Sequence, residues 1–225
     1  MSISPVAEAV AGFLSFVDST DPPGPGPVDL ATPAPTLGQD ALEVRLLIEA
    51  ARHGDREAFG ELVTMHERVV FRTALAALGS REDAEDASQE AFVVAWQKLG
   101  GFRAASTFRT WLLTIVWRKA LDRRRARQLW WVRTQSTFGA DGLDPLQTVT
   151  STGADPEAHA MSRDLARRIR AAIGGLTPKL RDTFVLASSG EHSYDEIAVM
   201  LGIPLGTVKW RVSEARKAIA KRLEH

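Results

Sequence analysis

The sequence of 225 residues contains no cysteine. A disulfide framework and a thiolate metal site are therefore excluded, and the composition is compatible with a reducing compartment. Apolar runs are all shorter than the roughly 20 residues of a membrane span. The apolar segment Val6–Val17 lacks the basic residues that begin a secretory signal, since the first basic side chain is Arg45. We therefore expect a cytoplasmic protein.

Residues that carry enzyme chemistry are few and scattered. The histidines stand without metal-ligand spacing, at His53, His66, His159, His192 and His225. A glycine-rich phosphate loop and a nucleophile motif are both missing. We therefore expect no cofactor, no bound metal and no small-molecule substrate, and an enzyme is the weakest functional hypothesis.

The chain also lacks a net charge and the alternation of polar and apolar residues that marks strands. A formal net charge of zero argues at first against a polyanionic partner. The charges are nevertheless segregated, because segment 118–133 and the last helix are basic while segments 81–90 and 139–157 are acidic. We therefore expect binding surfaces of both signs on an all-α protein.

Capping residues and glycines divide the chain into helices. The expected helices of the N-terminal half span 41–53, 56–78 (capped by Asp55), 81–99 (capped by Ser80) and 108–128 (capped by Ser106 or Thr107). In the C-terminal half we expect a helix at 157–172 and another that begins after Thr177, with Pro178 in its first turn.

Two stretches without helical period set the domain organisation. Residues 1–39 are rich in proline and glycine, and residues 131–156 mix glycine, aspartate, threonine, serine and proline. A loop of that length is unusual inside a compact domain. The sequence therefore predicts two small helical domains, 40–130 and 157–225, joined by a flexible linker and preceded by a flexible tail.

Residues 193–216 have the punctuation of a helix-turn-helix. Ser193 and Glu196 form a capping box, Gly202 ends the first helix, and Pro204 keeps it from resuming. We expect Thr207 to cap the second helix. The apolar face of the first helix is predicted at Tyr194, Ile197, Ala198 and Leu201, and the buried stripe of the second at Val208, Val212, Ala215, Ile219 and Leu223.

In a DNA-binding helix-turn-helix, the N-terminal part of the second helix lies in the major groove. That placement and the basic outer face nominate a set of DNA-contacting residues: Thr207, Lys209, Trp210, Arg211, Ser213, Glu214, Arg216 and Lys217. The alternative is a two-helix hairpin packed for stability alone.

Two earlier helices carry opposite charges. On helix 81–99, carboxylates would face a basic partner while alanines and aromatics pack inward or line the contact; the alternative is an acidic solvated face. Helix 108–128 alternates aromatic and cationic residues, which suits a melted DNA strand, because rings stack on unpaired bases and arginines follow phosphates. Its alternative is a core aromatic stripe with a solvated basic end. We expect Trp111 in the core and the arginine run facing DNA.

This layout resembles the extracytoplasmic-function (ECF) sigma factors, the smallest members of the sigma-70 family. Segment 83–96 resembles the region 2 helix that docks on the clamp helices of the RNA polymerase largest subunit. Segment 108–112, followed by 122–125, resembles the part that melts and reads the minus-ten element. Segments 176–184 and 193–216 resemble region 4, which reads the minus-thirty-five element.

The resemblance implies roles for individual residues. The polymerase-binding residues would be Asp83, Glu85, Asp86, Gln89, Glu90 and Phe92. The minus-ten and melting residues would be Phe102, Ser106, Thr107, Arg109, Trp117, Arg118, Lys119, Arg123, Arg124 and Arg125. Loop 100–107 would hold a flipped promoter base, and the acidic linker, with Asp141, Asp144 and Asp155, would either mimic RNA or serve as a plain tether.

The implied function is a promoter-specificity subunit that binds core RNA polymerase, directs it to promoters and nucleates melting. The implied partners are the clamp helices of the largest subunit, the flap of the second-largest subunit, promoter DNA and an anti-sigma factor. Trp210, Glu214 and Arg118 depart from the usual family residues, so the promoter sequence cannot be copied from a relative. A stand-alone repressor is the competing hypothesis, and it would need neither helix 81–99 nor the aromatic and cationic residues of helix 108–128.

Overall fold

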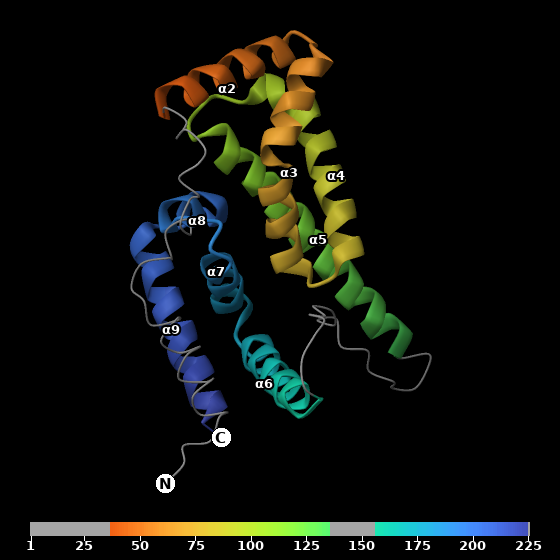
Figure 1. The fold of residues 1–225 in the computed structure, drawn as a ribbon, viewed down its shortest axis with the longest axis vertical. Helices are drawn as coiled ribbons and strands as arrows, with labels where there is room; N and C mark the ends of the chain where they lie inside the picture. The colour runs from red at the N-terminus through yellow and green to blue at the C-terminus, as the bar shows by residue number, and fades with distance from the viewer. Residues whose placement is uncertain (1–36, 136–155, 225) are drawn as a thin grey trace. The chain divides into compact units, whose positions relative to one another are not determined.

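The computed structural model describes residues 37–135 and 156–224. Within these ranges every regular element is a helix, which confirms the all-α prediction (Figure 1). The described helices form two units, α2 to α5 and α6 to α9. Most of the predicted tail, and the linker residues Asp141, Asp144 and Asp155, lie outside the described residues.

The first unit contains α2 (Leu37–Arg52), α3 (Arg56–Leu78), α4 (Arg81–Lys98), the short 3-10 helix η1 (Leu99–Gly101) and α5 (Phe108–Gln135). Helices α3, α4 and α5 pack on one another, and α2 lies across one end of them, against α3 and η1 (Figure 1). Alanines let α4 approach its neighbours closely, since Ala84, Ala87, Ala91 and Ala95 are all buried.

The predicted helix starts in this unit are mostly confirmed. The side chain of Asp55 accepts hydrogen bonds from the amides of Glu57 (2.9 Å) and Ala58 (3.1 Å). The Ser80 hydroxyl accepts from the amide of Asp83 at 3.3 Å. Of the two candidates before α5, Thr107 supplies the cap, because its Oγ1 accepts from the amide of Thr110 at 3.1 Å.

Several helix ends in this unit differ from the prediction. Helix α2 begins at Leu37 instead of 41, and α4 gives way to η1 at Leu99. Helix α5 continues to Gln135, beyond the predicted end at 128 and into the predicted linker. Segment 128–135 contains neither glycine nor proline, so no residue in it would end a helix that is already formed.

The second unit contains α6 (Pro156–Gly174), α7 (Pro178–Ser188), α8 (Tyr194–Leu201) and α9 (Leu205–Leu223). Helix α9 packs against the other three. One core cluster of buried residues joins α6, α7 and α9: Ala172, Leu176, Phe184, Ala215, Ile219 and Leu223.

Arginine side chains form hydrogen bonds between α6 and α9 near the C-terminal ends of the two helices. Arg222 of α9 donates to the carbonyl oxygens of Ala172 (2.9 Å) and Gly175 (2.7 Å), and Arg168 of α6 donates to that of Leu223 (2.8 Å). Carbonyl groups at the end of a helix lack an amide donor from the helix itself, and here the arginine guanidinium groups donate to them. These hydrogen bonds link α9 to α6 near the C-terminal ends of both helices.

Candidate functional site

The turn between α8 and α9 follows the predicted punctuation. The amide of Glu196 donates to the Ser193 hydroxyl at 3.2 Å, and the Ser193 amide donates to the Glu196 carboxylate at 3.0 Å, which completes the capping box. Gly202 ends α8 in the left-handed region, at φ 65°. Ile197 is buried as expected, but Met200 is the second buried residue of α8, while Tyr194, Ala198 and Leu201 are half-buried.

Thr207 does not cap α9. The helix begins at Leu205 and Pro204 occupies the cap position, where its carbonyl accepts from the amides of Thr207 (2.9 Å) and Val208 (3.2 Å). The fixed φ of proline suits an extended residue directly before a helix, and a proline there sacrifices no helical hydrogen bond. Thr207 therefore lies in the first turn of α9, half-buried.

Helix α9 separates a buried stripe from an outer face. All five residues of the predicted stripe are buried. Of the nominated contact residues, Lys209, Trp210, Ser213 and Lys217 are exposed, whereas Thr207, Arg211, Glu214 and Arg216 are half-buried. The indole of Trp210 is 60% exposed, an unusual position for a large apolar ring and one at which packing does not require tryptophan. The first two turns of α9 thus present an aromatic ring beside cations.

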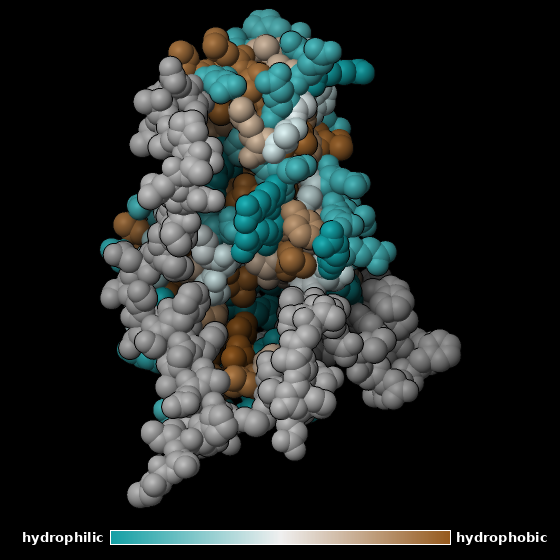
Figure 2. All heavy atoms as spheres, viewed as in Figure 1, coloured by the Kyte–Doolittle hydropathy of each residue, from teal (hydrophilic) through white to brown (hydrophobic). Residues whose placement is uncertain are grey.

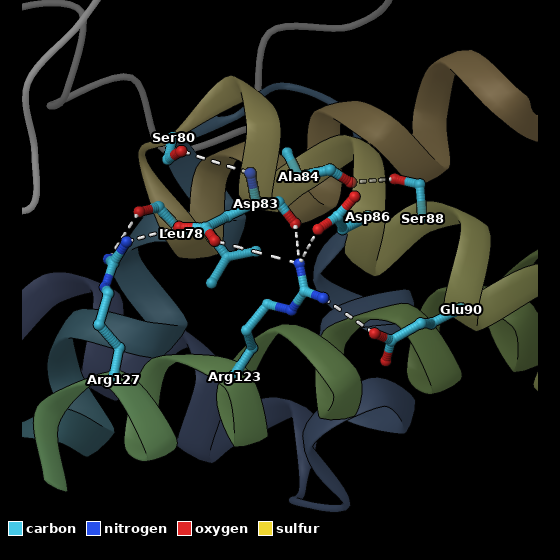
Figure 3. A network of polar contacts seen from close by, with 9 residues as sticks. All are labelled: Leu78, Ser80, Asp83, Ala84, Asp86, Ser88, Glu90, Arg123 and Arg127. Atoms are coloured by element: carbon cyan, nitrogen blue, oxygen red, sulfur yellow. Dashed lines mark hydrogen bonds and ion pairs between the residues drawn. The ribbon is translucent and has the colours of Figure 1, made fainter. Parts of the chain in front are cut away.

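A network of ion pairs fills the seam between α4 and α5 (Figure 3). The guanidinium of Arg123 donates to Asp86 and Glu90, both at 2.9 Å, and to the backbone carbonyl of Asp83 at 3.4 Å. Lys119 lies 3.5 Å from the second oxygen of Glu90. The hydrogen bond to Asp86 raises the pKa of Arg123. Residues that the sequence analysis assigned to a polymerase-binding surface and to a DNA-binding surface therefore contact each other in one seam.

Arg127 belongs to the same network, although the sequence analysis did not select it. Its guanidinium donates to the Asp83 carboxylate and to the carbonyl oxygen of Leu78, at 3.3 Å for the latter. Arg127 lies one turn beyond Arg123 on the same face of α5. Arg123 and Arg127 are spaced i, i+4, and Asp83 and Asp86 are spaced i, i+3, so each pair lies on one face of its helix. These two spacings were the sequence signal that could have indicated Arg127.

Four aromatic rings anchor the loop before α5. Phe102 contacts Phe108 and Trp111, with ring centroids 5.9 Å and 5.1 Å away, and Phe108 contacts His66 edge-on at 5.4 Å. Phe102 is only 9% exposed, so its ring is an anchor and offers little surface to a flipped base. Ser106 and Thr107 lie nearer the surface. Between them and the anchor, Ala104 adopts φ 52°, which alanine rarely does.

Trp117 is buried, which corrects its assignment to the DNA contact. It is 1% exposed and shares the inner face of α5 with Leu113 and Val116. Trp111, expected in the core, is half-buried. Helical spacing explains the difference, because Trp117 follows Leu113 by four residues and therefore lies on its face. Of the remaining nominated cations, Arg118 and Arg125 are exposed, while Arg109, Lys119, Arg123 and Arg124 are half-buried.

His66 lies beside the aromatic cluster. Its Nδ1 donates to the carbonyl oxygen of Leu62 at 2.9 Å. Burial lowers the pKa of His66, the hydrogen bond to Leu62 opposes this, and the positive charge of Arg109 lowers the pKa further. His66 is therefore neutral at neutral pH, with the proton on Nδ1.

Among the described residues, no group of His, Cys, Asp and Glu could hold a metal ion. The described helices include none that is both long and apolar enough to cross a membrane.

Comparisons with known proteins agree with this arrangement. Residues 62–129 match Sigma-70 region 2, and residues 166–219 match Sigma-70, region 4. The ECF RNA polymerase sigma factor SigW of Bacillus subtilis is 31% identical over 180 residues, which cover 80% of this chain and 96% of SigW. The ECF RNA polymerase sigma-E factor of Escherichia coli K12 is 31% identical over 82% of this chain and 96% of its own.

A solved structure shows the same fold. CnrH in complex with the cytosolic domain of CnrY matches with a TM-score of 0.54 and 26% identity, over 81% of this chain and 97% of that chain. In sequence, CnrH of Cupriavidus metallidurans is 32% identical over 80% of this chain and 94% of its own. The chain therefore belongs to the ECF RNA polymerase sigma factors, non-catalytic proteins that bind RNA polymerase and direct transcription initiation.

Proposed function

We propose that this sigma factor reads two promoter elements with separate units and nucleates melting at the upstream edge of the transcription bubble. Residues 40–130 would act on the minus-ten element and residues 157–225 on the minus-thirty-five element. The observation that carries the proposal is the outer face of α9, where Trp210 is 60% exposed while the opposite face is buried.

The minus-thirty-five contact would be made by the outer face of α9, between Thr207 and Lys217. Lys209 and Arg211 can donate to guanine or to phosphates, and Glu214 can accept from the amino group of cytosine. Trp210 would give an apolar contact, for example with a thymine methyl group. Thr207, Ser213, Arg216 and Lys217 would complete the interface with hydroxyl and cationic contacts.

The minus-ten contact would be made by α5 and the loop before it. Arg118 and Arg125 are exposed, and among the described residues Arg125 pairs with its helical neighbour Asp122 at 3.4 Å. Arg109 and Arg124 would assist as phosphate contacts. The loop held by the anchored Phe102 would place Ser106 and Thr107 against an unpaired base, and binding of that base would offset the cost of unstacking it.

The polymerase contact would be centred on α4 and fit the clamp helices of the largest subunit. Glu85, Asp86, Gln89 and Glu90 are exposed, and Phe92 is half-buried. Val93, which the sequence analysis did not select, is 56% exposed beside them. Apolar surface among carboxylates suits a basic amphipathic partner. Region 4 would contact the flap of the second-largest subunit, and a protein with these partners would act in the cytoplasm.

An anti-sigma factor is a further proposed partner. CnrH, which shares this fold, was solved in complex with the cytosolic domain of CnrY. In this chain, exposed apolar side chains also appear at the end of the first unit where α2 lies, including Leu42 and Leu46 (Figure 2). Such a partner would hold the sigma factor inactive by covering its polymerase-binding surfaces.

Run-off transcription with core polymerase and a promoter library tests the proposal. Transcript starts that share two upstream motifs, and that occur only when the protein is present, would support it. The Trp210→Ala variant should lose the upstream motif and retain polymerase binding. Duplex binding by the protein alone, without protein-dependent starts, would instead favour a repressor.

A further inference from the structure

We propose that Arg123 couples the polymerase-facing surface of α4 to the DNA-facing surface of α5. A basic partner on α4 would compete for Asp86 and Glu90, and so release Arg123 and Lys119 toward DNA. This inference rests on the proposed function, from which it takes the two surfaces. It starts from the seam of Figure 3, where residues assigned to these two surfaces are bonded to each other.

The guanidinium of Arg123 is committed within the protein. Its Nη1 donates to Asp86 at 2.9 Å and its Nη2 to Glu90 at 2.9 Å. The planar fork of arginine fits two carboxylates one helical turn apart, which a single lysine ammonium would not bridge as well. While these contacts persist, the same N–H groups do not reach a phosphate, and the carboxylates are partly neutralised toward a basic partner.

The seam is also accessible to a partner. The side chains of Asp86 and Glu90 are 55% and 49% exposed, against 29% for Arg123. A groove of about 530 Å³ runs along them, lined also by Gln89, Val93 and Lys119. Ion pairs exposed to this extent shift an equilibrium by at most about fivefold, so a basic side chain of a partner can replace Arg123 at low cost.

Arg127 would hold the helices together during this exchange. It bonds to the Asp83 carboxylate and to the carbonyl oxygen of Leu78, away from the groove. Helices α4 and α5 also pack directly on each other, and the alanines of α4 are buried. Release of Arg123 therefore needs a side-chain movement only. Because coupling is reciprocal, DNA on α5 would strengthen polymerase binding by the same factor.

The Asp86→Asn variant gives a test with a definite sign. It weakens the hold on Arg123 without removing any cation from α5. Binding of the full-length free protein to a fluorescent mixed-sequence single strand should tighten by about two- to fivefold. The slope of log K against log salt should steepen by up to about 0.7, the value of one additional phosphate contact on a single strand.

Glu82→Gln is the matched control, because it removes the same charge from an exposed position on the first turn of α4. A gain in single-strand affinity that both variants share is a general charge effect. Only the additional gain of Asp86→Asn over Glu82→Gln supports the coupling. That excess should disappear in the Arg123→Gln background. It should also disappear in saturated holoenzyme, where the polymerase already occupies Asp86.

Equal DNA binding by the two variants would overturn the coupling and leave Arg123 as a structural link between α4 and α5. If Asp86→Asn does not fold, as judged by circular dichroism, Glu90→Gln is measured against Glu82→Gln with the same expectation. Run-off transcription by the wild type separates the two proposals. Its failure would refute the proposed function, whereas a normal run-off with no excess would refute only the coupling.

Discussion

At the scale of single residues, burial decides which aromatic side chains are available for binding. Phe102 and Trp117 were both expected at the DNA, yet their rings are buried in the first unit. Trp210 was expected there too and is exposed. All three stand beside cations in the sequence. Composition therefore indicated a nucleic-acid surface, and only packing distinguished the anchors from the candidate contacts.

Replacement of Trp210 by alanine should weaken binding of a minus-thirty-five duplex by about 1–3 kcal/mol, the usual cost of one lost base contact. The free energy of unfolding should change by less than about 0.5 kcal/mol, because the ring is largely in solvent. Fluorescence anisotropy and urea unfolding measure the two effects. Val199→Ala, another exposed apolar residue of this unit, should change neither. A loss of stability without weaker binding would contradict a role for Trp210 in recognition.

His66 should make the first unit sensitive to acid. The pKa of His66 is lowered in the folded protein, so the unfolded state binds its proton more tightly. The associated stability is complete above a pH of about 6.5 and falls as the pH drops toward the lowered value, by at most about 1.4 kcal/mol per pH unit. Urea unfolding of His66→Gln between pH 7.5 and 5 should show a flatter dependence than wild type, and parallel curves would refute this role.

At the scale of elements, local signals placed most helix starts and turns. Asp55, Ser80 and the capping box at Ser193 act through atoms within a few residues, so sequence is sufficient to locate them. The prediction for Thr207 was wrong because threonine is a good cap in general, whereas α9 already begins at Leu205, directly after Pro204. Where two start signals stand close together, the sequence does not rank them.

The two candidate caps give a direct comparison. Ser193→Ala should cost about 1 kcal/mol of unfolding free energy, because an amide of α8 loses its acceptor. Thr207→Ala should cost less than about 0.5 kcal/mol, because its hydroxyl caps nothing. Thermal or urea unfolding of the second unit measures both. Equal losses would mean that the start of α9 is wrongly placed.

Two glycines at the turn should respond to alanine in opposite directions. Gly202 has φ 65° and open space around its absent Cβ, so Gly202→Ala should destabilise through the backbone alone, by about 1–2 kcal/mol. Gly206 lies within α9, also with open space, so Gly206→Ala should stabilise by about 0.5–1 kcal/mol. Both are read from unfolding midpoints, and a destabilising Gly206→Ala would show that this helix start is strained.

At the scale of the whole molecule, the zero net charge conceals local fields. Binding of promoter DNA should still weaken steeply with salt, because only the cations at the interface displace counterions. Lys217→Gln should reduce the slope of log K against log salt for a minus-thirty-five duplex by about 0.9. Lys98→Gln, the same charge change on α4, should leave that slope unaltered, and equal slopes for all three proteins would place Lys217 outside the interface.

The sequence by itself determined the helical class, most caps, the helix-turn-helix and the family, because these depend on short spacings and on residue types that recur in order along the chain. The tertiary structure decided which nominated residues are free to bind. It buried Phe102 and Trp117. It also placed Arg123 between Asp86 and Glu90, although Arg123 follows each of them by more than thirty positions in the sequence. Such pairings depend on how α4 and α5 pack together, and helical periodicity alone does not specify which faces of two helices meet.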